Sequence, residues 1–263
     1  NAIFRKAGSQ CFAARIEDHP RCIARILEPG QPVGKAPAIE DHTPLFIKEP
    51  APKGLYPPKG VNKIGADRNQ PPCGSFRQQG IAQMEESARR MDVKQFDLIA
   101  VHNLQDWQTH LDTLKAWKEE GKVRYIGITT SHGRDHEALV EIMRSQPLDF
   151  VQFSYNIEDR SAETELLPVA ADRGIATMIN RPYQRGALFS KSRGRALPAL
   201  AAELDCSSWG QFYLKYILGH PAVTCIIPAT ASVHHMEDNM RANYGRLPDE
   251  QQRADMLRLF EQL

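Results

Sequence analysis

From residue 94 onward, short apolar runs alternate with helix-periodic segments, and this alternation restricts the possible folds more than any other feature of the sequence. The first run, Phe96–His102, ends in a histidine. The later runs are 123–128, 149–153, 175–179 and 223–227. Strands separated by helices pair in parallel through right-handed crossovers. The sequence therefore predicts an α/β fold with five βα units after residue 94.

Residues that start or stop helices support this division. The predicted N-caps are Asp106, Ser208 and Asp249, the last with Gln252 as its capping-box partner. Gly121 and Gly174 are predicted to end helices in the left-handed conformation. A further helix is expected to begin near Ser232. These local signals place the helix boundaries independently of the apolar periodicity.

Residues 1–78 do not continue the pattern. They hold 11 of the 18 prolines and three of the five cysteines. The sequence allows only a short helix over 13–27 and a short strand over 45–47, since proline interrupts regular ladders. We therefore divide the chain into an irregular segment, 1–78, and an α/β portion, 79–263. Because the first segment lacks hydrophobic periodicity, a frameshift or mis-set start explains it best; a variant domain that caps the α/β portion is the alternative.

Composition favours a small-molecule partner. The chain has 263 residues, a net charge of +1 and no run of about 18 apolar residues, so nothing indicates a nucleic-acid or membrane surface. The five cysteines are an odd number and show no metal-binding spacing, which favours a reducing compartment. We expect a cytoplasmic protein without a structural metal. The sequence leaves the oligomeric state open.

Five ordered segments resemble the aldo-keto reductase family. They are Asp97–Asn103, Trp117–Gly127, Gln152–Asn156, Arg181–Leu188, and Ile227–Thr230 followed by Met236–Asn239. The resemblance implies a TIM-type (β/α)8 barrel of which this chain carries strands four to eight, so the barrel is expected to be incomplete. It also implies hydride transfer from NAD(P)H to the carbonyl carbon of an aldehyde or ketone.

Residue-by-residue comparison with the family gives the first group of candidate site residues. His102 matches the histidine that orients the carbonyl, and Gln152 matches a glutamine that binds the nicotinamide carboxamide. Thr130 stands where the family usually has an asparagine with the same task. Asn180 stands where many members stack a tyrosine on the nicotinamide. The loop from Arg181 to Gly186 would line the pyrophosphate.

A second group follows the last strand. Thr230 matches a phosphate-contacting hydroxyl, and Asp238 and Asn239 match groups that contact adenine. The start of the following helix adds its positive dipole end to a phosphate site. Ala229 and His235 stand where many members carry two cations for the 2′-phosphate, so the cofactor is NADP or NAD with weakened NADPH preference. The adjacent His234 and His235 lack the spaced carboxylates or cysteines of a metal site.

The rest of the family's catalytic set, an aspartate, a tyrosine and a lysine, should lie upstream of Gly80. Tyr56 is the only tyrosine there, and no upstream acid precedes a tyrosine by the family's five residues. Two functions therefore stay open: an NAD(P)H-dependent reductase, and a catalytically inactive relic that keeps part of a cofactor pocket. A phosphate-binding barrel of another chemistry is a third, less favoured class.

Overall fold

A computed structural model describes residues 11–14, 74–130 and 135–263. Within them, six strands form a single sheet in the order β1-β2-β3-β4-β5-β6. The strands are β1 (Cys11–Ala14), β2 (Phe96–His102), β3 (Val123–Thr129), β4 (Phe150–Ser154), β5 (Ala176–Asn180) and β6 (Cys225–Ile226). Strands β2 to β6 are parallel, which confirms the five predicted βα units.

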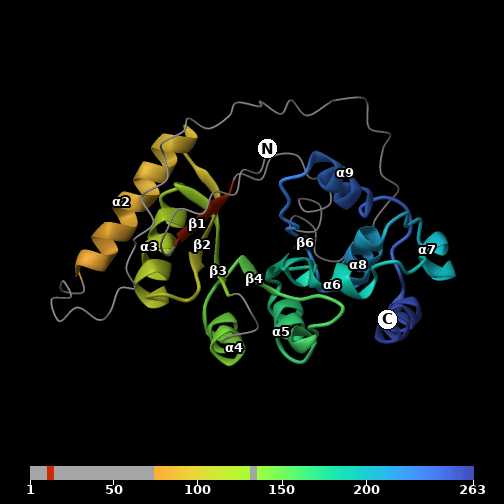
Figure 1. Ribbon diagram of the computed structural model, residues 1–263. Coiled ribbons are helices and arrows are strands. Elements are labelled where there is room, and N and C mark those ends of the chain that lie inside the picture. The colour runs from red at the N-terminus through yellow and green to blue at the C-terminus, as the bar shows by residue number, and fades with distance from the viewer. Residues whose placement is uncertain (1–10, 15–73, 131–134) are drawn as a thin grey trace, which may run out of the picture.

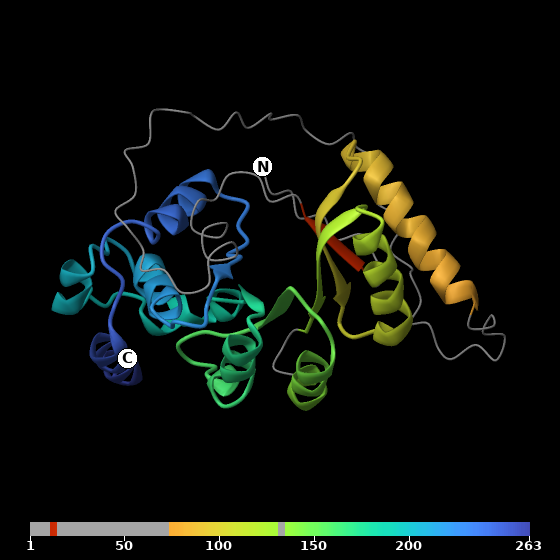
Figure 2. The same cartoon turned by 180° about the vertical axis from the view of Figure 1, so that it is seen from behind.

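The helices follow one another around the outside of the curved sheet, as in part of a barrel (Figure 1). The view from behind shows the same order (Figure 2). The longer helices are α2 (Gly74–Met91), α3 (Trp107–Glu119), α4 (His136–Ser145), α5 (Leu166–Arg173), α8 (Trp209–Leu218), α9 (Val233–Arg241) and α10 (Glu250–Glu261). Short elements connect them: η1 (Ser161–Glu163), η2 (Gln184–Gly186), α6 (Ala187–Lys191) and α7 (Ala199–Glu203).

Strand β1 departs from the sequence prediction. It pairs antiparallel with β2, with Cys11 opposite Val101 and Ala14 opposite Leu98. The expected helix over 13–27 is therefore wrong for Ala13 and Ala14, and the rest of that range lies outside the described residues, as does the strand expected over 45–47. Because β1 covers the β2 edge, this end of the parallel sheet is not open.

The two faces of the sheet have different neighbours. Side chains alternate between the faces of a strand. One set, exemplified by Ile99, Ile128 and Phe153, packs with the helices in the large core. The opposite set forms a small cluster of Leu98, Phe150 and Met178. We call this second face the inner face, because the helices cover the other one.

Gly127 lies on the inner face and lets two strands approach closely. A Cβ atom at this position would lie 2.6 Å from the carbonyl oxygen of Phe150, which is shorter than real contacts allow. Across the same two strands, the rings of Tyr125 and Phe150 meet edge to face, 5.8 Å apart. The glycine that ends the second family-like segment, Trp117–Gly127, is thus explained by packing.

Most predicted helix ends are confirmed. The Ser208 side chain accepts from the Gln211 N–H, Asp249 and Gln252 form the capping box, and Gly174 has a φ of 65°. Gly121 also has a positive φ, 73°. Asp106 occupies the predicted N-cap position of α3, but its φ is 43° and its side chain accepts from the Thr109 hydroxyl and caps no backbone N–H.

Two predicted boundaries differ from the structure in extent. The last strand is limited to Cys225–Ile226, within the predicted 223–227. Helix α2 begins at Gly74, so it crosses the division that the sequence suggested between residues 78 and 79. The start of α9 after Ser232 agrees with the prediction.

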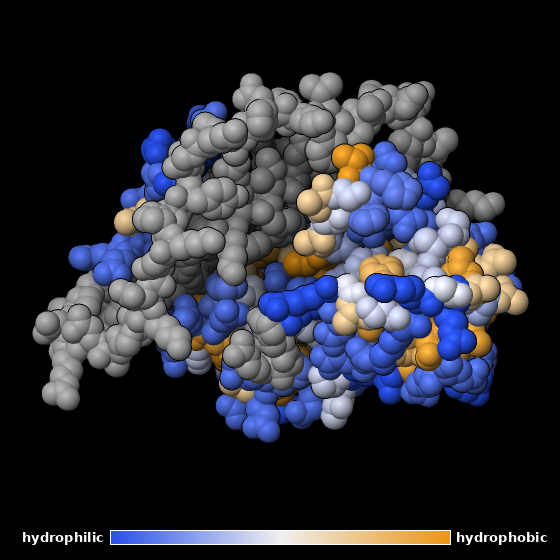
Figure 3. Space-filling view, viewed as in Figure 1, coloured by the Kyte–Doolittle hydropathy of each residue, from blue (hydrophilic) through white to orange (hydrophobic). Residues whose placement is uncertain are grey.

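The surface is predominantly polar, with small apolar groups over the part that contains α7 to α9 (Figure 3). The exposed large apolar side chains of the described residues all follow residue 186: Phe189, Val233, Met240, Tyr244 and Leu247. Among the helices of the described segments, none is long and apolar enough to span a membrane.

Candidate functional site

The inner face is apolar where the parallel strands begin and polar where they end. His102, Thr129, Gln152, Ser154 and Asn180 occupy this face at the carboxyl ends of β2 to β5. Register brings them together, since His102 pairs with Thr129, Thr129 with Gln152, and Ser154 with Asn180. Ligands of parallel sheets bind beyond the carboxyl ends of the strands. We call these five residues, together with Thr130, the strand-end cluster.

Thr130 follows β3 directly and is buried, with 2% of its surface exposed. Its N–H donates to the carbonyl oxygen of Gln152 at 2.8 Å, and its own carbonyl oxygen accepts from Asn180 Nδ2 at 3.0 Å. Its side-chain Oγ1 has no hydrogen-bond partner. A buried hydroxyl left unpaired costs free energy. Here that hydroxyl lies at the edge of the sheet where a ligand is expected.

Asn180 uses both ends of its carboxamide inside the strand-end cluster. Oδ1 accepts from Ser154 Oγ at 2.5 Å, while Nδ2 donates to Thr130. The side chain is about nine-tenths buried. The sequence predicted only that an amide would replace the family's ring at this position. The structure adds that two neighbouring strands orient the amide.

The loop that follows β5 has an unusual backbone. Arg181, Gln184 and Arg185 have φ values of 53°, 48° and 57°. Such conformations are costly for residues other than glycine and cluster at functional sites. The Arg181 carbonyl oxygen accepts from Asn156 Nδ2 at 3.2 Å, which ties the loop to the segment after β4. This loop is the predicted pyrophosphate-lining segment.

Helix α9 holds the predicted adenine-contacting pair. Both carboxylate oxygens of Asp238 accept hydrogen bonds at 2.6 Å, one from Ser208 Oγ and the other from Gln211 Nε2. The neighbouring Asn239 is buried, and its Oδ1 accepts from the Tyr183 hydroxyl at 2.6 Å. These contacts join α9 to the start of α8 and to the loop after β5.

Thr230 and His235 flank the start of α9. Thr230 Oγ1 accepts from the Ser232 N–H at 3.1 Å, and the Ser232 hydroxyl in turn accepts from the His235 N–H. Both Ala229 and His235 are exposed. The His235 ring lies 6.0 Å from that of His234. Within the described segments, no three His, Cys, Asp or Glu side chains are arranged to hold a metal ion.

Sequence reasoning missed two residues of this region. Ser154 lies two positions after Gln152, so strand alternation alone could have placed it on the same face. Tyr183 lies in the loop that was expected to line the pyrophosphate, but no individual role was predicted for it. Burial, and then the charge of Asp238, raise the pKa of Tyr183 well above its usual value. Its hydroxyl therefore stays protonated and donates to Asn239.

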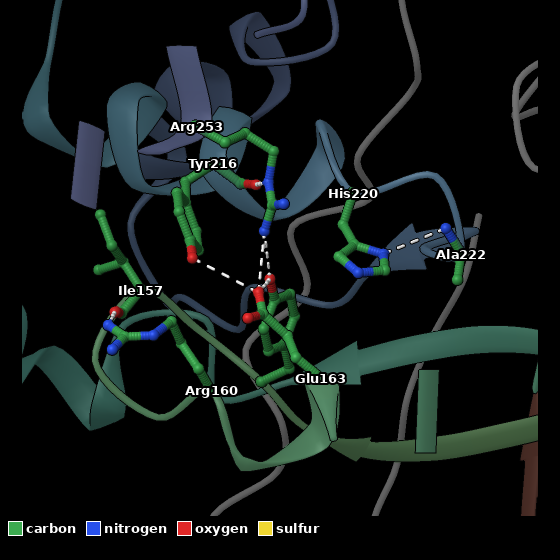
Figure 4. Close-up of polar contacts among 8 residues, drawn as sticks. Ile157, Arg160, Glu163, Tyr216, His220, Ala222 and Arg253 are labelled. Carbon is green, nitrogen blue, oxygen red and sulfur yellow. Dashed lines mark hydrogen bonds and ion pairs between the residues drawn. The ribbon is translucent and has the colours of Figure 1, made fainter. Parts of the chain in front are cut away.

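A second buried polar group, the arginine cluster of Tyr155, Glu163, Tyr216 and Arg253, lies elsewhere in the molecule. The Arg253 guanidinium bonds Glu163 Oε1 at 2.9 Å and the Tyr155 hydroxyl at 2.7 Å, while Tyr155 donates to Glu163 at 2.5 Å. Figure 4 shows Glu163 between Arg253 and Tyr216, with His220 nearby. The cluster links η1, α8 and α10.

Comparison with known proteins identifies the family. The sequence profile of the aldo/keto reductase family matches residues 55–254, which is most of the chain. This chain belongs to the aldo/keto reductase family. The matched range begins upstream of residue 79, where the sequence suggested a boundary.

Two related proteins are named as an oxidoreductase and a reductase. An oxidoreductase of Schizosaccharomyces pombe, described as uncharacterised, is 29% identical over 240 residues, covering 86% of this chain and 75% of its own length. The NADH-specific methylglyoxal reductase of Escherichia coli is 30% identical over 112 residues, which cover 39% of this chain and 32% of the reductase. The chain thus spans only about a third of that enzyme.

Solved aldo-keto reductase structures share the fold. The apo form of an enzyme from Bacillus halodurans gives a TM-score of 0.57 at 19% identity, covering 70% of this chain and 68% of that enzyme. A Klebsiella pneumoniae enzyme in complex with NADP and acetate gives 0.52 at 21% identity, covering 67% and 62%. Both likenesses support the α/β barrel architecture expected from the sequence.

The remaining members of the family's catalytic set are expected in the segment upstream of Gly80. Tyr56 lies outside the described residues, and the same holds for every lysine upstream of Gly80. Of the predicted catalytic set, the structure therefore places His102 alone, half-buried at the end of β2. Its role in catalysis stays a prediction.

Proposed function

We propose that this chain binds a nicotinamide dinucleotide along the strand-end cluster and the start of α9, and uses it to reduce a small aldehyde or ketone. The unpartnered Oγ1 of Thr130 carries this proposal. The backbone N–H and carbonyl oxygen of Thr130 are both used within the cluster, whereas its side-chain hydroxyl is available for a polar ligand. The carboxamide of a nicotinamide has both a donor and an acceptor for such a group. When bound, NAD(P)H supplies a hydride.

The chain's own residues fit the rest of the dinucleotide. Thr130 and Gln152 would hold the carboxamide, with the Asn180 amide beside the ring. Arg181 and the loop after β5 would line the pyrophosphate, and the first turn of α9 adds its positive dipole end. In α9, each Asp238 oxygen keeps a second lone pair beyond its bond to α8, which leaves acceptor capacity toward an adenine.

His102 would act on the carbonyl. Its position on the inner face, paired in register with Thr129 and one residue from Thr130, puts the imidazole on the side of the sheet where the nicotinamide would lie. A ring N–H directed at the carbonyl oxygen would orient the substrate and stabilise the negative charge that develops there. We assign no residue as the proton donor.

A binding protein without turnover is the second candidate, and one observation favours it. No acid upstream of Gly80 precedes a tyrosine by five residues, although the family resemblance requires that spacing. The strand-end cluster and α9 would support cofactor binding whether or not a proton donor is present. Binding and turnover must therefore be measured separately.

The experiment pairs two measurements on the folded chain. Oxidation of NADPH and of NADH is followed with 4-nitrobenzaldehyde, and cofactor binding is followed by quenching of tryptophan fluorescence. Turnover that His102→Gln reduces at least about a hundredfold, with binding retained, supports the reductase. Saturable binding without turnover supports the binding protein. Absence of binding by a chain with folded circular dichroism overturns both.

For cofactor choice, we propose that NADH and NADPH bind with similar affinity. Ala229 supplies no charge for a 2′-phosphate, and His235 is a solvent-exposed imidazole, not a permanent cation. Ala229→Arg should tighten NADPH binding about tenfold and leave the affinity for NADH unchanged, because only NADPH carries the 2′-phosphate. An equal change for both cofactors would contradict the proposed location of the phosphate.

A further inference from the structure

Ser154 makes a contact that the proposed function does not yet use. Its hydroxyl is buried at the end of β4 and donates to Asn180 Oδ1 at 2.5 Å across the β4–β5 pair. The orientation of the amide is unambiguous. The Thr130 carbonyl oxygen can only accept, so the other end of the amide, which faces it at 3.0 Å, must be the Nδ2 donor.

The contact extends over three strands. Ser154 on β4 holds Asn180 at the end of β5, and Asn180 holds the carbonyl of Thr130 after β3. Thr130 is fixed a second time by its N–H bond to the Gln152 carbonyl. A backbone held at both its N–H and its C=O fixes where the unpartnered Thr130 Oγ1 lies. Ser154 therefore acts on this hydroxyl through Asn180, without needing to touch a ligand itself.

We propose that Ser154 is a positioning residue for the nicotinamide end of the cofactor. Its bond to Asn180 sets the plane of the amide beside the nicotinamide and the position of Thr130 Oγ1, which binds the carboxamide. This inference rests on the proposed function. It concerns only one end of the dinucleotide, because the residues expected at the adenine end are held separately by Ser208, Gln211 and Tyr183.

This restriction to one end provides the test. Binding is measured for whichever of NADPH and NADH binds more tightly, and for the matching ADP-ribose fragment, which lacks the nicotinamide. Ser154→Ala should weaken binding of the complete dinucleotide about fivefold, as expected for one lost hydrogen bond. The affinity for the ADP-ribose fragment should not change. Ser154→Thr keeps the hydroxyl and should restore most of the affinity.

Ser192→Ala is the matched control. Ser192 is also a buried serine, but its hydroxyl bonds a backbone carbonyl in α6 and not the strand-end cluster. Ser192→Ala should leave the affinities for the dinucleotide and for the ADP-ribose fragment unchanged. The fluorescence of bound NAD(P)H adds a second readout, since Ser154→Ala changes the surroundings of the nicotinamide and Ser192→Ala does not.

The outcomes separate the two proposals. Equal weakening of dinucleotide and fragment by Ser154→Ala, or no weakening of either, would overturn the positioning role while cofactor binding by the unchanged chain still stands. If the unchanged, folded chain binds neither dinucleotide, the proposed function fails, and the role of Ser154 fails with it.

Discussion

Ser154 and Tyr155 are neighbours in the sequence, yet they belong to two buried polar groups of opposite character. In the arginine cluster, the Tyr155 hydroxyl, Glu163 and Arg253 bond one another. In the strand-end cluster, the Thr130 hydroxyl has no partner. A buried group that is internally paired serves the fold, whereas one that leaves a polar atom unpaired is a candidate site. The following four predictions test this distinction.

The largest effect is expected from Arg253→Met. Arg253 is well buried, with 14% of its side chain exposed, and its removal leaves Glu163 without its cation. Loss of one partner of a buried ion pair typically costs a few kcal/mol, and solvent screens part of this loss because 33% of the Glu163 side chain is exposed, so the free energy of unfolding should fall by about 2 kcal/mol. Urea denaturation measures this change. Adding Glu163→Leu should recover part of the loss, and cofactor binding by the folded fraction should not change.

A smaller loss is expected from Tyr155→Phe, which removes only the hydroxyl. Burial, followed by the nearby Tyr216, raises the pKa of Tyr155 far above its usual value, so the wild-type group is a neutral donor. Removing it should lower stability by about 1.5 kcal/mol. Thermal unfolding of this variant, of Arg253→Met and of the double variant forms a cycle. Additive effects in that cycle would show that the two residues are not coupled.

Thr130→Val should act in the opposite sense on stability. The substitution keeps the shape of the side chain and removes a hydroxyl that has no partner, so the free energy of unfolding should rise by about 1 kcal/mol. The same change should weaken NAD(P)H binding. A variant that is less stable and binds normally would show that the hydroxyl serves the fold, and the contrast between the two clusters would fail.

The smallest effect is expected from pH. Burial, and then the charge of Arg253, lower the pKa of His220 below its ordinary value of 6.5, although Glu163 acts against them. The unfolded chain therefore binds more protons at mildly acidic pH. This contribution to stability is complete above pH 6.5 and is lost as pH falls through the folded-state pKa. The free energy of unfolding should be measured for wild type and for His220→Gln between pH 5 and 8. The two values should converge at the acidic end of this range.

The success of sequence reasoning depended on whether the deciding contacts were local. The capping of α8 by Ser208 and the turn at Gly174 could be predicted, because each depends on a few neighbouring residues. Asp106 was correctly placed at the N-cap of α3, but spacing does not reveal that its side chain accepts from Thr109 while its backbone adopts a positive φ.

Other features depended on register. Asn180 was predicted as a site residue by position, but its bond to Ser154 follows from which residues of β4 and β5 are paired. The link between Tyr183 and Asn239 joins residues 56 positions apart. No pattern in the sequence predicts such a bond. The location of the candidate site and its residues stay predictions from the sequence, and the structure supplied the hydrogen-bond partners of these residues.

The pairing of β1 with β2 also bears on how the chain folds. The paired residues Cys11 and Val101 lie far apart in the sequence. In contrast, a single helix joins the paired strands β2 and β3. Closing so long a loop costs more entropy than any connection between successive βα units. We therefore expect β1 to be added last. Until then the β2 edge can pair with another chain, so refolding yield should decrease as protein concentration increases.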